Sequence, residues 1–130
     1  MTKTLIDTSA WIDFFRNSSS RYADAVTTLI EQDAAVITGP VISELLQGLK
    51  TQREAETLGE LLNVITCIDV SHEDWIITGA LLGKLRRNGI TVPLTDALIA
   101  IVAKQNKCNV LTIDQHFKHL GVPLYAVCIQ

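Results

Sequence analysis

Four acidic residues lie beside apolar runs, where a carboxylate is costly to bury without a partner. They are Asp7, Glu44, Asp96 and Asp114. If the fold brings them together, the natural partner for so much negative charge is a divalent cation, and hard oxygen ligands favour Mg²⁺ or Mn²⁺. Such an ion can lower the pKa of bound water and neutralise charge on a scissile phosphate. The four acids therefore point to hydrolysis of phosphodiesters.

Helix capping is the competing explanation for three of these acids. Asp7, Asp96 and Asp114 fall at predicted helix starts, where an acid satisfies free N–H groups and the helix dipole. Glu44 differs, because it lies past the first residues of its helix and borders the apolar arc formed by Val41, Ile42, Leu45, Leu46 and Leu49. Capping does not explain Glu44, which makes it the most informative member of the set.

Short apolar strands that alternate with helices position these acids. We predict strands at 3–6, 34–38, 64–70, 109–113 and 123–128, and helices at 10–15, 22–30, from 39–40 onward, at 51–63, 71–87 and from 95–96 to about 106, with a short turn or helix at 114–120. This alternation predicts an α/β, three-layer sandwich, with a short parallel sheet of about five strands and helices on both faces. Ligands of such folds bind beyond the carboxyl ends of the strands. Asp7 and Asp114 should lie at these ends, with Glu44 and Asp96 near them.

Composition fits one globular domain over residues 1–130. Hydrophobic residues make up 48% and charged residues 19%, which argues against disorder. The net charge of −3 argues against nucleic-acid binding by bulk electrostatics, but it leaves a nuclease possible because metal ions carry local positive charge to the phosphate.

Cysteine usage and the apolar runs bear on the compartment. Cys67, Cys108 and Cys128 are far apart and form no CxxC pair, so we predict three reduced, half-buried thiols. No apolar stretch reaches the roughly 18 residues of a membrane span, and the first residues do not have the layout of a signal peptide. We therefore expect a cytoplasmic protein that does not associate with membranes.

Hydroxyl groups accompany the acids. Thr8 and Ser9 follow Asp7, and Thr112 lies two residues before Asp114. They can orient carboxylates or metal-bound water, although capping or turn chemistry is an equal alternative for Ser9. His116 lies two residues after Asp114 and can approach the site, but we favour a turn histidine that packs locally.

Four segments resemble one family. LIDTSAWI (5–12), PVISELLQG (40–48), PLTDALIA (93–100) and LTIDQHF (111–117) resemble the acidic motifs of PIN-domain ribonucleases, most of all the VapC-type toxins of bacterial toxin–antitoxin modules. The segments occur in the same order with comparable spacing and span nearly the whole chain.

The resemblance implies roles for these residues. Asp7, Glu44, Asp96 and Asp114 would be the catalytic acids, and Asp7, Asp96 and Asp114 the metal ligands. Thr8, Ser9 and Thr112 would be supporting polar residues. It also implies an endoribonuclease that uses Mg²⁺ or Mn²⁺, forms a homodimer and is inhibited by a cognate antitoxin, with operator DNA bound only through the toxin–antitoxin complex.

Other functions remain as alternatives. A catalytically silent PIN-fold module that binds RNA or a protein would share the fold, but a pure scaffold has no need for four mutually repelling acids. A haloacid-dehalogenase-type phosphatase needs a second Asp two residues after the first, and here that position is Ser9. A Ser-His-Asp triad lacks the GxSxG nucleophile elbow, and a dinucleotide site lacks GxGxxG.

Overall fold

The computed structural model describes residues 2–17 and 19–127. Its centre is a parallel sheet of four short strands: β1 (Thr4–Ile6), β2 (Ala35–Thr38), β3 (Thr66–Ile68) and β4 (Asn109–Leu111). The strand order is β3-β2-β1-β4, so the first and last strands are neighbours in the sheet. In register, Leu5 lies opposite Val36 on one side and Val110 on the other.

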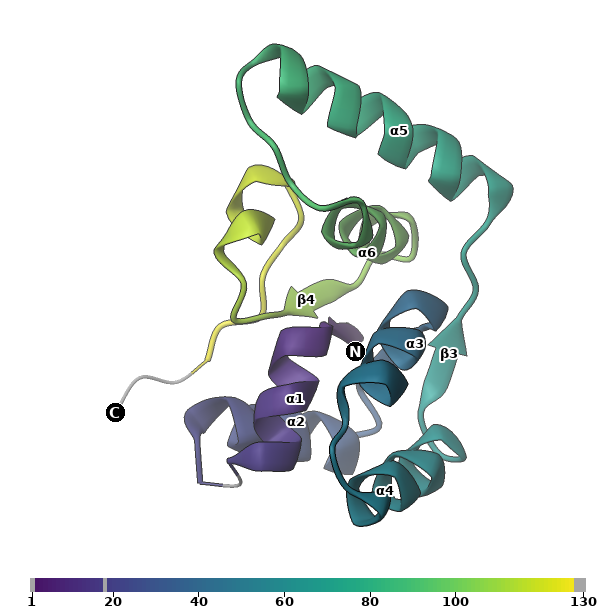
Figure 1. The fold of residues 1–130 in the computed structure, drawn as a ribbon, viewed down its shortest axis with the longest axis vertical. Coiled ribbons are helices and arrows are strands. Elements are labelled where there is room, and N and C mark those ends of the chain that lie inside the picture. The colour runs from purple at the N-terminus through teal and green to yellow at the C-terminus, as the bar shows by residue number, and fades with distance from the viewer. Residues whose placement is uncertain (1, 18, 128–130) are drawn as a thin grey trace.

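Within the described residues, six helices flank the sheet (Figure 1). They are α1 (Thr8–Arg16), α2 (Arg21–Glu31), α3 (Gly39–Gly48), α4 (Gln52–Leu62), α5 (His72–Arg87) and α6 (Leu94–Gln105), followed by the 3₁₀ helix η1 (Gln115–His119). Several begin where the sequence predicts. Asp7 caps α1, and Ser71 with Asp74 forms a capping box that starts α5. Asn88 and Gly89, with φ of 78° at the glycine, follow the end of α5.

The strand order creates a switch point between β1 and β4. From β1 the chain moves to β2 and then β3, and it returns across the sheet to β4. Right-handed crossovers place α1 to α4 over one face and α5 and α6 over the other. The packing of α1 on α2 and α3, and of α5 on α6, agrees with this arrangement. Ligands of open α/β sheets bind at such a switch point, beyond the carboxyl ends of the strands.

Helix α6 is the most deeply buried helix of the sandwich. Its residues from Ala97 to Ala103 are all buried, and it packs between α5 and β4. This burial explains why the segment is apolar on every side, since a helix with no exposed face needs no polar stripe. The first turn of α6 carries Asp96, so the core fixes the position of that carboxylate.

The predicted α/β fold class is confirmed, but the fifth strand is wrong. Of the described residues from Pro123 to Val127, only Leu124 bridges to the sheet, opposite Val110. Val110 donates to the carbonyl of Pro123, and Tyr125 donates to the carbonyl of Val110. Pro123 has no N–H to extend this ladder, so pairing stops at one bridge. Cys128, the predicted end of that strand, lies outside the described residues.

Two predictions about burial are also corrected. Cys67 is exposed, because β3 is an edge strand, and Cys108 is buried; both thiols are free, and neither is half-buried as predicted.

Within the described residues, no helix combines the length and apolar character needed to cross a membrane.

Candidate functional site

Asp7 is the most buried of the four acids. It follows β1 directly and caps α1, and only 3% of its surface is exposed. Its Oδ2 accepts hydrogen bonds from the Ser9 and Thr112 hydroxyls, each at 2.8 Å. Burial raises the pKa of the Asp7 carboxyl above its ordinary value, and the hydrogen bonds from Ser9 and Thr112 oppose this without cancelling it.

Thr112 and Ser9 connect the ends of β1 and β4. The Thr112 Oγ1 donates to Asp7 and accepts from the backbone N–H of Asp114 at 2.9 Å. The Ser9 Oγ donates to Asp7 and accepts from the N–H of Ile113 at 3.0 Å. Each hydroxyl has one proton, and both protons are used on Asp7, so the 3.2 Å contact between the two hydroxyls is not a further hydrogen bond. The two residues therefore fix the Asp7 carboxylate relative to the loop that carries Asp114.

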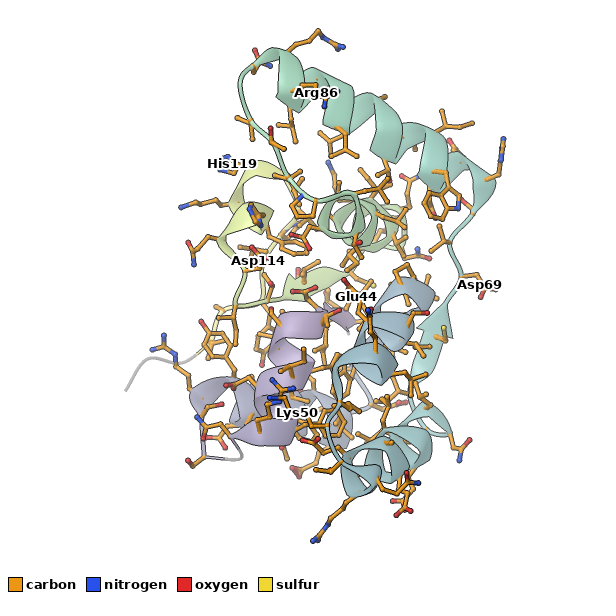
Figure 2. The ribbon with its side chains drawn as sticks, in the orientation of Figure 1. Glu44, Lys50, Asp69, Arg86, Asp114 and His119 are labelled. Atoms are coloured by element: carbon orange, nitrogen blue, oxygen red, sulfur yellow. The ribbon has the colours of Figure 1, made fainter. Side chains whose placement is uncertain are left out.

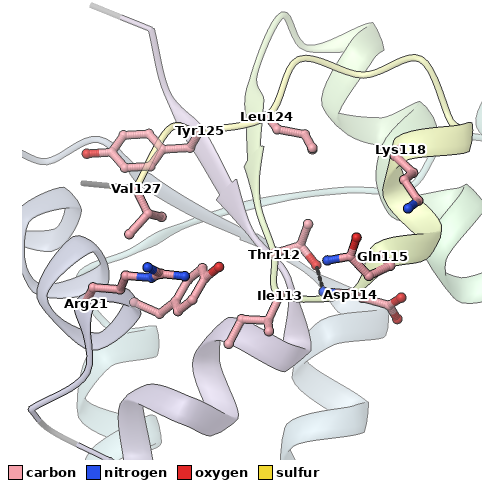
Figure 3. A pocket seen from close by; sticks show the side chains of 10 residues that line it. Arg21, Thr112, Ile113, Asp114, Gln115, Lys118, Leu124, Tyr125 and Val127 are labelled. Atoms are coloured by element: carbon pink, nitrogen blue, oxygen red, sulfur yellow. Dashed lines mark hydrogen bonds between the residues drawn. The ribbon is translucent and has the colours of Figure 1, made fainter. Parts of the chain in front are cut away.

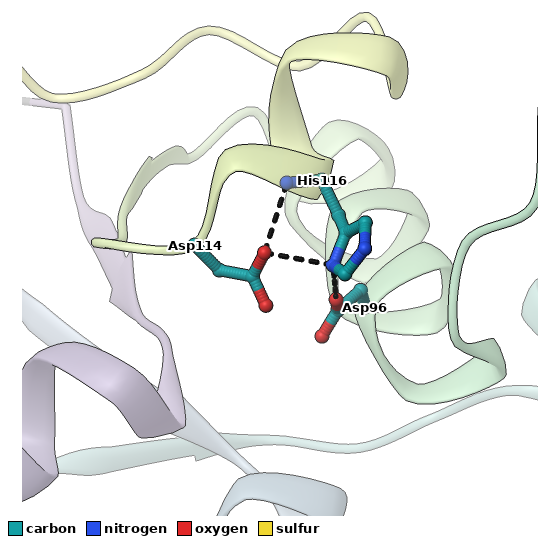
Figure 4. Close-up of side chains that lie close together, drawn as sticks. All are labelled: Asp96, Asp114 and His116. Carbon is teal, nitrogen blue, oxygen red and sulfur yellow. Dashed lines mark hydrogen bonds and ion pairs between the residues drawn. The ribbon is translucent and has the colours of Figure 1, made fainter.

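Asp96, Asp114 and His116 form the second part of the site (Figure 4). The His116 Nδ1 lies 2.8 Å from Asp114 Oδ1 and 3.3 Å from Asp96 Oδ2. Asp114 also caps η1 by accepting from the His116 N–H at 2.9 Å. The short turn thus delivers an acid and an imidazole to the carboxylate on α6.

Asp96 is the most perturbed of the site acids. Its burial, followed by the charges of Asp114 and Asp7, raises the pKa of Asp96 to about 7, and His116 opposes the shift. The Asp96 Oδ2 atom is buried and makes no hydrogen bond to the described residues. The nearest cationic group is the His116 Nδ1 at 3.3 Å, which lies closer to Asp114, so the burial of this oxygen is compensated only in part. It is an available ligand atom.

Glu44 belongs to the site through Thr8. The Thr8 hydroxyl donates to Glu44 Oε1 at 2.7 Å, which links α1 to α3. Glu44 is half-buried, and Figure 2 shows it with Asp114 near the middle of the molecule, whereas Asp69 and Arg86 lie toward its periphery. Thr8 therefore orients Glu44, while Ser9 and Thr112 orient Asp7.

The donor set fits a divalent cation. One ligand atom from each of Asp96, Asp114 and His116 lies within 4.8 Å of the others. Asp7 is outside this group, but its charge acts on Asp96. Carboxylate oxygens suit Mg²⁺ and Mn²⁺, and an added cation would relieve the repulsion by Asp114 and Asp7 that adds to burial in raising the pKa of Asp96.

The structure gathers the predicted residues and adds one. Asp7, Asp96 and Asp114 meet at the carboxyl edge of the sheet, and Glu44 reaches it through Thr8. The sequence favours a turn histidine that packs locally at position 116, but the structure places the His116 imidazole between two carboxylates. The sequence feature that could have indicated this position is that His116 lies two residues after Asp114, in the turn that follows β4.

Comparison with known proteins agrees with this architecture. The family model for the PIN domain matches residues 4–123. VapC ribonuclease Mb1587 from Mycobacterium bovis and ribonuclease VapC11 from Mycobacterium tuberculosis are each 32% identical to this chain over 117 residues, 87% of either length. The chain therefore belongs to the PIN-domain family and, within it, to the VapC ribonucleases, which confirms the resemblance seen in the four motifs.

Solved structures share the fold at lower identity. VapBC2 from Rickettsia felis, solved with a promoter DNA fragment, has a TM-score of 0.79 and 20% identity, with 95% of this chain and 98% of that one covered. VapC20 from Mycobacterium tuberculosis, a toxin that cleaves the sarcin–ricin loop, has a TM-score of 0.70 and 16% identity over 92% and 96% of the two chains. Both similarities show that this chain has the same fold as these proteins.

We predict that metal-free protein loses stability as the pH rises toward 7. Since the pKa of Asp96 is raised in the folded state, that state binds more protons than the unfolded chain between its ordinary pKa and about 7, and the free energy of unfolding falls across this window. Asp96→Asn should raise the free energy of unfolding at pH 8 by about 1–3 kcal/mol, and by much less at pH 5. Denaturant unfolding in EDTA measures this; Glu60→Gln, an exposed control, should change neither value. Destabilisation by Asp96→Asn at pH 8 would contradict the prediction.

The hydroxyl of Thr112 gives a second prediction. Thr112→Val removes a donor to Asp7 and the acceptor of the Asp114 N–H, so the free energy of unfolding should fall by about 1–3 kcal/mol. The pKa of Asp7 should rise further, because the variant lacks a hydrogen bond that favours the charged form. Carboxyl NMR titration and denaturant unfolding test both effects. Thr112→Ser keeps the hydroxyl and should retain the pKa of Asp7; an equal shift in both variants would contradict the assignment.

Proposed function

We propose that this protein is a Mg²⁺- or Mn²⁺-dependent endoribonuclease that acts as the toxin of a toxin–antitoxin pair. The observation that carries the proposal is the buried Asp96 Oδ2, which has no hydrogen bond among the described residues and faces Asp114 and His116. Membership of the VapC ribonucleases supports RNA as the substrate. The repelling acids support a bound cation.

Each residue has a role in this proposal. Asp96 and Asp114 would hold the ion, with Asp7 beside them, and the His116 imidazole lies against Asp114 and near Asp96. When bound, Mg²⁺ or Mn²⁺ supplies charge neutralisation at the scissile phosphate and lowers the pKa of coordinated water.

The hydroxyls keep the acids in position for hydrolysis. Ser9 and Thr112 hold the Asp7 carboxylate, which keeps its charge directed at the site. Thr8 occupies Oε1 of Glu44, leaving the second oxygen of that carboxylate to accept a proton from the attacking water. Glu44 thus has a role that neither capping nor core packing supplies.

The electrostatics disfavour a catalytically silent module. Burial and the charges of Asp114 and Asp7 raise the pKa of Asp96, so ionising Asp96 lowers the stability of the metal-free protein at neutral pH. A scaffold that only bound RNA or a protein would lose this stability without any benefit to its function. Hydrolysis at a bound cation, in contrast, explains the presence of all four acids.

Cleavage of labelled single-stranded and hairpin RNA tests the proposal. We expect cleavage with Mg²⁺ or Mn²⁺ and none in EDTA. Asp7→Asn and Asp96→Asn should each lower the rate at least about 100-fold, because each removes charge stabilisation at the reacting phosphate. Glu60→Gln, an exposed acid on α4, is the matched control and should cleave at the wild-type rate.

Two results would refute the metal mechanism. Cleavage that persists in EDTA would show that no divalent ion is needed. Cleavage at the wild-type rate by both Asp7→Asn and Asp96→Asn would show that the acids do not carry the reaction. If wild-type protein binds RNA but never cleaves it with either metal, the silent-module alternative holds.

We also propose the partners of a toxin: a second copy of the chain, an inhibitory antitoxin, and operator DNA bound only through the antitoxin complex, all in the cytoplasm. Solved complexes of VapBC2 and of VapBC from Salmonella typhimurium with DNA support this arrangement. Of the apolar side chains on α1 and α3, Trp11 and Leu45 are fully buried and cannot contact a partner, while Leu46 is 56% exposed and can.

The isolated protein should therefore be a dimer without affinity for DNA. Light scattering after gel filtration should give about twice the 14.3 kDa mass of one chain. With a net charge of −3, the protein alone should not retard a DNA duplex at physiological salt. A monomer at micromolar concentration, or DNA binding by the protein alone, would contradict this part of the proposal.

A further inference from the structure

A pocket of about 250 Å³ adjoins the acidic site (Figure 3). Thr112, Ile113, Asp114 and Gln115 form one wall, and Leu124, Tyr125 and Val127 form another. Arg21 and Lys118 lie on opposite sides of it in Figure 3. Because Asp114 belongs both to this pocket and to the acidic cluster, any chain bound at the acids can continue into the pocket.

The pocket supplies the positive charge that the acidic site lacks. Arg21 and Lys118 are exposed, and neither forms an ion pair with a described acid. The Arg21 guanidinium lies 5.4 Å from the centroid of the Tyr22 ring, which steadies it beside the pocket. A polyanion approaching four carboxylates needs cations nearby, and these two side chains provide them.

The remaining lining suits an unpaired base. Tyr125 is half-buried with Leu124 beside it, so this wall is largely apolar and aromatic. Gln115, on the opposite wall, offers an amide donor and acceptor for a base edge. The volume is small for a ligand site and admits one base with its sugar, and aromatic walls bind bases that are already unstacked.

We propose that this pocket is a nucleotide subsite for single-stranded RNA. It holds the nucleotide next to the scissile phosphate, with its base against Tyr125 and successive phosphates on Arg21 and Lys118. This inference rests on the proposed ribonuclease function and adds where the flanking strand binds. It also explains how a protein of net charge −3 holds a polyanion beside its acids.

Binding of a labelled single-stranded RNA of about ten nucleotides tests the two cations, in an Asp96→Asn background that slows cleavage. Arg21→Gln with Lys118→Gln should weaken binding about tenfold and lower the slope of log K against log salt by about 0.7 for each phosphate that the protein no longer neutralises. The matched control is Arg53→Gln with Lys84→Gln, two exposed cations elsewhere that make the same charge change. It should leave the slope unchanged.

The aromatic wall has its own test. Tyr125→Ala should weaken RNA binding about tenfold, whereas Tyr125→Phe keeps the ring and should bind as the parent does. In otherwise wild-type protein, Tyr125→Ala should raise KM for RNA cleavage and leave kcat nearly unchanged, as expected for binding energy that is equal in substrate and transition state. Circular dichroism and thermal melting establish that each variant is folded.

The outcomes separate the subsite from the nuclease. If wild-type protein cleaves RNA and the Arg21/Lys118 variant keeps the parent's affinity, KM and salt slope, the subsite is refuted and the nuclease stands. If wild-type protein cleaves no RNA, but 5′-phosphorylated dinucleotides shift the NMR signals of Gln115 and Tyr125, the nuclease is refuted and the nucleotide site stands. Equal reductions in the Arg53/Lys84 control would also overturn the subsite.

Discussion

The hydrogen-bonded carboxylate of Asp7 is the contact on which the site depends. It follows β1, caps α1 and accepts hydrogen bonds from Ser9 and from Thr112, which follows β4. The same two hydroxyls accept hydrogen bonds from the backbone N–H groups of Ile113 and Asp114. One buried acid thus fixes how the loop after β4 sits against the first helix. Because these strands are neighbours at the switch point of the sheet, this contact sets the geometry of the edge where the acids gather.

Helix α6 supplies the rigid support from the other side. With every residue from Ala97 to Ala103 buried, it has little freedom to move when charge accumulates at its first turn. Asp96 is therefore held near Asp114 and Asp7 despite their repulsion, and its burial together with their charges raises its pKa to about 7. The core stabilises an arrangement that is unfavourable without a cation. This conflict between local electrostatics and packing is typical of functional sites.

Much of the fold can be predicted from the sequence, because the patterns that indicate helices and strands are local. Ser71 and Asp74 indicate the start of α5 through hydrogen bonds within one turn, and the apolar run after Asp96 requires a buried helix. The predicted fifth strand failed because strand pairing depends on a neighbour: Val110 offers only one bridge to a segment that contains Pro123. For the same reason the exposure of Cys67 was not foreseen, since only the sheet order makes β3 an edge.

The sequence by itself determined the chemistry available: four acids in family-like motifs, with hydroxyls beside them. The tertiary structure alone decided which of these side chains contact one another. It placed His116 between Asp96 and Asp114, assigned Thr8 to Glu44 and Ser9 with Thr112 to Asp7, and set Arg21 and Lys118 around a pocket beside the acids. Residue types and their spacing along the chain set the local propensities that determine the helices and strands. Distances between segments a hundred residues apart follow only from strand order and core packing, and those distances set charge coupling and ligand geometry.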